Sequence, residues 1–129
     1  MKKCIFLLSL VLLFSLFSGC KPVEYEYEQP IEQVKQVFIV LEDNGSERRI
    51  ECKQEILTDI QSLPCRKYWN DPPHKIVAPY VLIEYNNNAI EEICAQSNYY
   101  EIDGKFDFDW EYFDNEAFLK VLQKYQTGE

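Results

Sequence analysis

The hydrophobic and polar positions of this chain alternate with the periods of strands and helices. Six strands are predicted in three hairpins: 34–41 with 47–52, 80–85 with 89–94, and 99–102 with 105–112. The strand over 34–41 is rich in Val, Ile and Phe, which indicates burial on both faces. The turns at Asn44-Gly45 and Asp103-Gly104 favour tight hairpins, because these residues tolerate a positive φ.

The last strand, 105–112, alternates strictly. Its aromatic residues are Phe106, Phe108, Trp110 and Tyr112, and its charged residues are Lys105, Asp107, Asp109 and Glu111. A period of two places these sets on opposite faces. We expect the aromatic face to pack on the core and the charged face to meet solvent.

Two segments have helical spacing. Ile56, Leu57, Ile60 and Leu63 share one face of a helix that Pro64 ends, and Phe118, Val121, Leu122 and Tyr125 share one face of another. Asp114 is a good N-cap for the second helix. The order ββα-ββ-ββα predicts a single α+β domain over 33–129, with an antiparallel sheet of about five to six strands and two helices on one face.

The first twenty residues form a different pattern. Lys2 and Lys3 precede an apolar run over 5–17, which small residues follow at Ser18 and Gly19. A positive start, a short apolar run and small residues are typical of a secretory signal. The run is shorter than the ~20 residues that span a bilayer as a helix.

The residues Leu16-Phe17-Ser18-Gly19-Cys20 resemble the lipobox of bacterial lipoproteins, although Phe17 stands where Leu is commonest. The resemblance implies removal of a signal peptide over 1–19, a diacylglyceryl group on the Cys20 thiol, and a lipid anchor on the exported side. The location would be the cell membrane or an outer membrane. In such lipoproteins an Asp after the lipidated cysteine favours retention at the inner membrane, and Lys21 stands at that position here. An ordinary secretory cleavage after Gly19 is the alternative. The mature chain also loosely resembles uncharacterised small lipoprotein families, which implies no activity.

After Cys20, residues 21–32 carry two prolines and four glutamates. Such a composition buries little surface, so we interpret 20–32 as a lipidated cysteine and a flexible tether that holds the domain off the membrane.

Charge narrows the range of partners. The chain has 22 acidic and 13 basic residues, a net charge of −9, and loss of Lys2 and Lys3 lowers this by two to −11. Nucleic acid is therefore not an expected partner, because phosphate binding needs a basic surface. No cofactor is predicted.

Three cysteines, Cys52, Cys65 and Cys94, follow the anchor. In an oxidising compartment one disulfide is plausible. The expected helix holds Cys52 and Cys65 too far apart, so Cys65–Cys94 is the favoured pair and Cys52 the free thiol. Three reduced core cysteines are the alternative.

Candidate chemistry is sparse. The single histidine, His74, shares a loop with Cys65, which leaves a hydrolase as a remote alternative, but nothing in the spacing predicts catalysis. Asp103, Asp107 and Asp109 are weak metal candidates that do not fit a calcium loop, and a solvated strand face explains them better. We predict no enzyme.

The long loop over 64–78 is the most informative feature. It gathers basic and aromatic residues in an acidic chain: Arg66, Lys67, Tyr68, Trp69, His74 and Lys75. Such residues anchor protein interfaces. The alternative is that Tyr68 and Trp69 fold down to cap the core. The sequence predicts a lipid-anchored, non-catalytic binding domain for a protein or envelope component, with a carrier of a small ligand or cation as the alternative.

Overall fold

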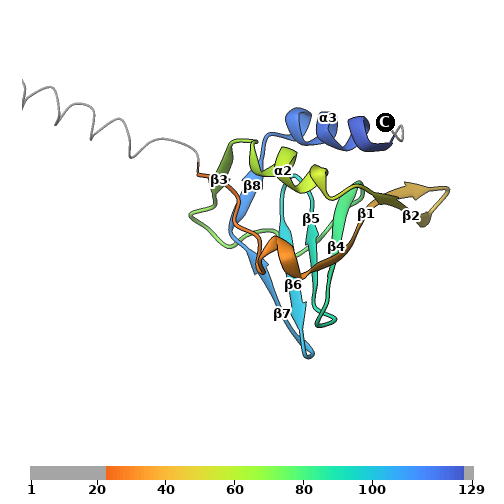
Figure 1. The fold of residues 1–129 in the computed structure, drawn as a ribbon. Helices are drawn as coiled ribbons and strands as arrows, with labels where there is room; N and C mark the ends of the chain where they lie inside the picture. The colour runs from red at the N-terminus through yellow and green to blue at the C-terminus, as the bar shows by residue number, and fades with distance from the viewer. Residues whose placement is uncertain (1–22, 127–129) are drawn as a thin grey trace, which may run out of the picture.

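The computed structural model describes residues 23–126, which form an α+β domain (Figure 1). Six antiparallel strands lie in the order β2-β1-β4-β5-β6-β7, and β3 and β8 form a separate two-stranded sheet. The elements are η1 Ile31–Gln33, β1 Val34–Asp43, β2 Ser46–Cys52, α2 Glu55–Gln61, β3 Cys65–Lys67, β4 Tyr80–Tyr85, β5 Ile90–Ile93, β6 Asn98–Ile102, β7 Lys105–Asp109, β8 Glu111–Phe113 and α3 Asn115–Gln126. The predicted fold class is confirmed. The expected signal peptide and Cys20 lie outside the described residues.

The three predicted hairpins are present, and their turns have the expected backbone. Asn44 and Gly45 have φ values of 53° and 81°, and Asp103 and Gly104 have 52° and 78°. Both positive angles match the primed turns that follow the natural twist of a hairpin. The first two hairpins join where β1 pairs with β4, with Phe38 opposite Leu82.

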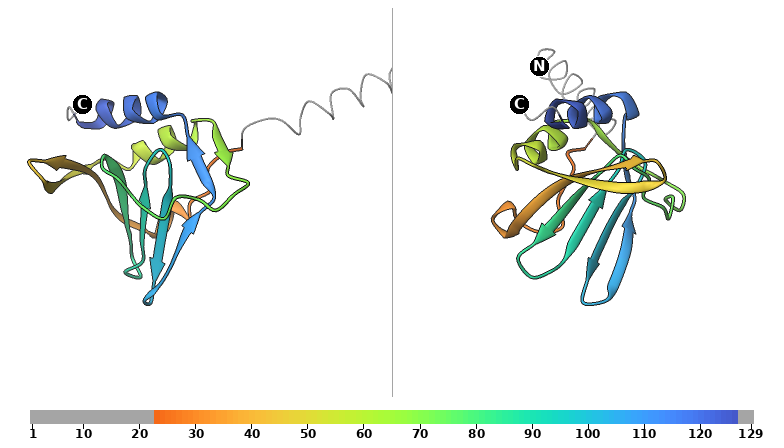
Figure 2. Two further views of the ribbon diagram at one scale, coloured as in Figure 1. Left: turned by 180° about the vertical axis from the view of Figure 1, so that it is seen from behind. Right: turned by 90° about the vertical axis from the view of Figure 1, so that its right-hand side faces the viewer.

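Both helices pack on the same face of the sheet and lie side by side (Figure 2). One core cluster joins Ile39 and Ile83 of the sheet to Ile60 of α2 and Leu122 of α3, all fully buried. The predicted N-cap is confirmed, since the Asp114 carboxylate accepts a hydrogen bond from the Ala117 amide at 3.0 Å. Within residues 23–126, no helix is long and apolar enough to cross a membrane.

The tether prediction is wrong for residues 23–32, because this segment packs on the domain. Val23 and Cys65 exchange two backbone hydrogen bonds, of 2.9 and 3.1 Å. Tyr25 is completely buried, and Tyr27 donates a hydrogen bond to the Leu57 carbonyl. We call residues 23–30 the N-terminal strap. Its tyrosines supply the buried surface that a count of prolines and glutamates did not consider.

The prediction of one strand over 105–112 with a buried aromatic face is also wrong. The strand breaks at Trp110, so β7 ends the large sheet and β8 pairs with β3. Phe106 is 66% exposed and Trp110 45% exposed. The buried aromatic residue is instead Phe113, one position past the predicted strand. The Phe113 ring packs on the rings of Tyr25 and Phe118.

The cysteines do not pair. Cys52, Cys65 and Cys94 are free thiols, so the favoured Cys65–Cys94 disulfide does not form. Cys65 is buried where β3 meets β8, and the Cys94 thiol lies 3.3 Å from the Ser97 carbonyl and hydroxyl. The structure thus agrees with the alternative of three reduced thiols.

Candidate functional site

A cleft of about 630 Å³ lies between the N-terminal strap, β3 and the β7–β8 junction. Eight residues line this acidic cleft: Glu26, Tyr27, Glu28, Lys67, Tyr68, Asp109, Trp110 and Glu111. Four carboxylates therefore face one lysine, and three aromatic side chains complete the walls.

The local sequence explains why acids line the cleft. Residues 24–28 alternate as Glu-Tyr-Glu-Tyr-Glu, and Tyr25 is completely buried while Glu26 and Glu28 stay exposed. On the opposite wall, the break at Trp110 separates Asp109 at the end of β7 from Glu111 at the start of β8. The hydrogen bond from the Tyr68 amide to the Trp110 carbonyl, at 2.6 Å, holds the 64–78 loop against this break.

The carboxylates of the cleft perturb one another. Partial burial, then a hydrogen bond with Asp109 and the negative charge of Asp109, raises the pKa of Glu28 to about 8. Burial and the charge of Asp109 also raise the pKa of Glu111, against the opposing effect of Lys67. Glu28 is thus protonated at neutral pH, and a cation in the cleft would favour its ionisation.

Beneath the cleft lies a buried carboxyl, Glu91 on β5. Glu91 is fully buried and accepts hydrogen bonds from the hydroxyls of Tyr25 and Tyr85 and from the Glu28 amide, the last at 3.0 Å. Burial raises its pKa, although these three donors oppose the shift. Because Tyr25 and Glu28 belong to the N-terminal strap, Glu91 fixes the cleft wall to the sheet.

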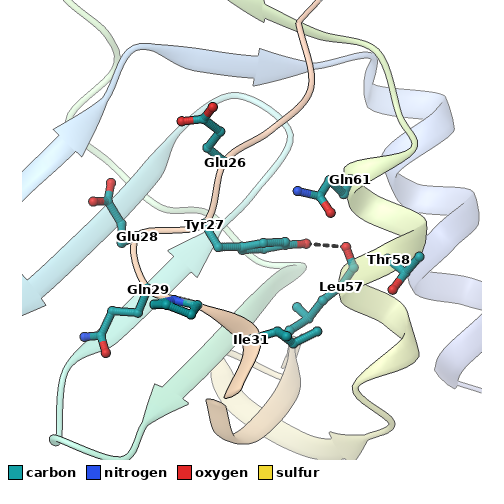
Figure 3. Close-up of a pocket in the computed structure, with 9 residues that line it drawn as sticks. Glu26, Tyr27, Glu28, Gln29, Ile31, Leu57, Thr58 and Gln61 are labelled. Atoms are coloured by element: carbon teal, nitrogen blue, oxygen red, sulfur yellow. Dashed lines mark hydrogen bonds between the residues drawn. The ribbon is translucent and has the colours of Figure 1, made fainter. Parts of the chain in front are cut away.

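A second pocket, of about 510 Å³, lies on the other side of the strap (Figure 3). Figure 3 shows the Tyr27 ring extending toward Leu57 of α2, while Glu26 and Glu28 extend away from that helix. Its lining shares Glu26, Tyr27 and Glu28 with the acidic cleft, and the rest of it has no titratable group: Gln29, Pro30, Ile31, Leu57, Thr58 and Gln61. The acidic cleft adds Lys67, Asp109 and Glu111 to the shared residues, so it holds more charged groups.

The predicted interface residues of the 64–78 loop do not form one site in the structure. Lys67 and Tyr68 line the acidic cleft, and the Tyr68 hydroxyl donates to the Gln96 carbonyl at 2.7 Å. Arg66 is exposed, and Trp69 is 95% exposed, so Trp69 does not cap the core. His74 stacks on Phe108, with ring centroids 5.1 Å apart.

The predicted metal and hydrolase residues are not assembled. Only Asp109 of the three aspartates lines the cleft, whereas Asp103 occupies a hairpin turn and Asp107 is exposed. Over residues 23–126, no group of three or more ligands is placed to hold a metal ion. Within the same residues, no hydrogen bond joins Cys65 to His74, and burial raises the pKa of Cys65 to about 12, which disfavours a thiolate.

Sequence reasoning missed Glu26, Tyr27, Glu28, Glu91 and Trp110 as site residues. The strict alternation over 24–28 was the available signal, because it is the pattern of an extended segment with one buried face. No family model, no curated protein and no solved structure matches the chain.

Proposed function

We propose that this chain is a lipid-anchored binding protein of the bacterial envelope, whose acidic cleft takes a cationic group of a protein or envelope component. The observation that carries the proposal is the lining of the cleft, with Glu26, Glu28, Asp109 and Glu111 against a single lysine, Lys67. A primary amine or a guanidinium would satisfy these carboxylates with charge-assisted hydrogen bonds.

The aromatic walls favour an organic cation over a metal ion. Tyr27, Tyr68 and Trp110 line the same cleft, and aromatic faces attract ammonium and guanidinium groups. A hard metal ion would need clustered oxygen ligands at short range. The proposal thus joins two functions that the sequence offered as alternatives, binding of a protein or envelope component and binding of a cation.

The anchor is the second part of the proposal. Residues 16–20 have the order of a lipobox, and Cys20 would carry the lipid. We expect metabolic labelling with palmitate to mark the chain, and Cys20→Ser to abolish both the label and recovery in the membrane fraction. Equal labelling of the two chains would refute the anchor.

Cleft binding is tested with a fluorescent lysine-rich peptide and an otherwise identical peptide in which alanine replaces lysine. The double variant Asp109→Asn, Glu111→Gln should weaken lysine-peptide binding by at least about tenfold, because one lost charged hydrogen bond costs roughly 1.5–3 kcal/mol. The matched control, Asp103→Asn with Asp107→Asn, removes the same charge from the same hairpin outside the cleft. Equal weakening by both double variants would show that net charge alone attracts the peptide.

A further inference from the structure

The start of the described chain fixes where a lipid on Cys20 would lie. Val23 is paired by two backbone hydrogen bonds with Cys65, the first residue of β3. Three residue steps separate Cys20 from Val23, and a fully extended chain covers about 10 Å in three steps. On the proposed function, in which Cys20 is lipidated, the domain edge around β3 therefore lies within about 10 Å of the membrane surface.

This edge carries exposed residues suited to a lipid headgroup region. Trp69 is 95% exposed, Trp110 is 45% exposed and Val23 is 45% exposed. The hydrogen bond from the Tyr68 amide to the Trp110 carbonyl places the segments of the two tryptophans side by side. We call Val23, Arg66, Trp69 and Trp110 the tryptophan edge. Figure 1 shows β3, β8 and the start of the strap together at this edge, away from the tip of β7.

The chemistry of the edge matches a bilayer interface. Indole has an apolar body and an N–H donor, which is why tryptophan is enriched where hydrocarbon meets headgroups. The exposed Arg66 adds a guanidinium that can pair with lipid phosphate. The adjacent cleft is acidic, so general electrostatic attraction to anionic lipid does not drive this contact. Insertion of the indole rings therefore has to supply the driving force for membrane contact. The lipid on Cys20 would keep the tryptophan edge near the bilayer.

We propose that the tryptophan edge seats in the headgroup region of the same leaflet that takes the lipid on Cys20. The domain then lies on the membrane in a defined orientation, with Trp69 as the deepest residue and the acidic cleft opening next to the lipid surface. The flexible spacer expected from the composition is replaced by a short link and a docked edge.

The protein provides its own probe, because Trp69 and Trp110 are its only two tryptophans. We would reconstitute the full lipidated chain in vesicles of phosphatidylcholine and phosphatidylglycerol and record tryptophan emission with and without brominated acyl chains. Trp110→Phe isolates Trp69. We expect its emission to shift to shorter wavelength on the vesicles and to lose intensity with the brominated lipid.

Two control variants separate docking from other effects. Phe106→Ser removes an exposed aromatic residue near the tip of the β6–β7 hairpin and should change neither the wavelength shift nor the quenching. Trp69→Ser should leave the urea unfolding midpoint unchanged, because Trp69 covers no core. In this variant the remaining Trp110 should be quenched less than in the parent chain.

Vesicle flotation distinguishes failure of docking from failure of the anchor. A chain that floats with the vesicles but keeps its aqueous emission and escapes quenching refutes the docked edge and leaves the anchor intact. A chain that does not float refutes the anchor, and the docked edge falls with it. Quenching of Trp69 in floated chain supports both.

Discussion

Replacing Tyr25 by Phe tests the contact that holds the N-terminal strap on the domain. The Tyr25 ring is completely buried, and its hydroxyl donates to the Glu91 carboxylate, which is also fully buried. The substitution keeps the ring and removes one of three donors to a buried charge. A hydrogen bond to a charged group contributes about 1.5–3 kcal/mol, so we expect the free energy of unfolding to fall by about 2 kcal/mol.

The assay is urea unfolding of a soluble form that begins at Lys21, at pH 8 and pH 5. The loss should be larger at pH 8, because the donor stabilises the ionised form of Glu91, and acid protonates this carboxyl readily since burial raises its pKa. A double-mutant cycle with Glu91→Gln isolates the pair, and we expect a coupling of about 1 kcal/mol or more.

Tyr85→Phe is the matched control. Tyr85 also donates its hydroxyl to Glu91, but from β4 rather than from the strap. Both variants should lose stability, and only Tyr25→Phe should increase hydrogen exchange at the Val23 and Cys65 amides beyond the global change. A loss below about 0.5 kcal/mol, or strict additivity with Glu91→Gln, would refute the role assigned to this network.

Three further predictions concern the cleft and the core. Folding raises the pKa of Glu28 from 4.5 to about 8, so protonated Glu28 contributes to the free energy of unfolding. This contribution is fully present below pH 4.5 and is lost as the pH rises through 8. Glu28→Gln should therefore flatten the fall of the urea unfolding midpoint over this pH range. Asp114→Ala should cost about 1 kcal/mol of unfolding free energy by removing the cap of α3, and Asp114→Asn should restore most of it. Phe118→Ala should cost about 3–5 kcal/mol, whereas Phe106→Ser should stay within about 0.5 kcal/mol in the same titration; equal costs would contradict the burial of Phe118 and the exposure of Phe106.

Local chemistry made the hairpins and helices predictable. Asn44-Gly45 and Asp103-Gly104 adopt the positive φ that their residue types favour, and the neighbouring residues alone decide those turns. The cap at Asp114 and the face around Phe118 are likewise set within a few positions of the chain. The α+β class followed from these local signals and their order.

The strap was not predictable in this way, because its stability comes from distant residues. Tyr25 is 66 positions from Glu91, and the partner of Val23, Cys65, follows only after β1, β2 and α2. The prolines and glutamates of residues 21–32 predicted a segment too polar to order, and that count left out Tyr25 and Tyr27. Glu91 and Cys65 stabilise the strap only after the fold has brought them next to it.

The site depended on a break that the pattern did not contain. Residues 105–112 alternate without interruption, yet the chain leaves the large sheet at Trp110 and pairs β8 with β3. Alternation assigned Trp110 to the face opposite Asp109 and Glu111, yet all three residues line the acidic cleft, and Asp107 does not. A period of two describes one unbroken strand, so it does not hold across a point where tertiary packing divides the strand between two sheets.

On the proposed function, the strap connects the anchor to the acidic cleft. Its first residue, Val23, would lie three positions from the lipidated Cys20, and its Glu26 and Glu28 form one wall of the cleft. Releasing Tyr25 from Glu91 would therefore lengthen the link to the membrane and open the cleft in one step. A flexible tether would separate membrane anchoring from binding in the cleft. Because the strap is packed on Glu91, a change at this carboxyl should affect both.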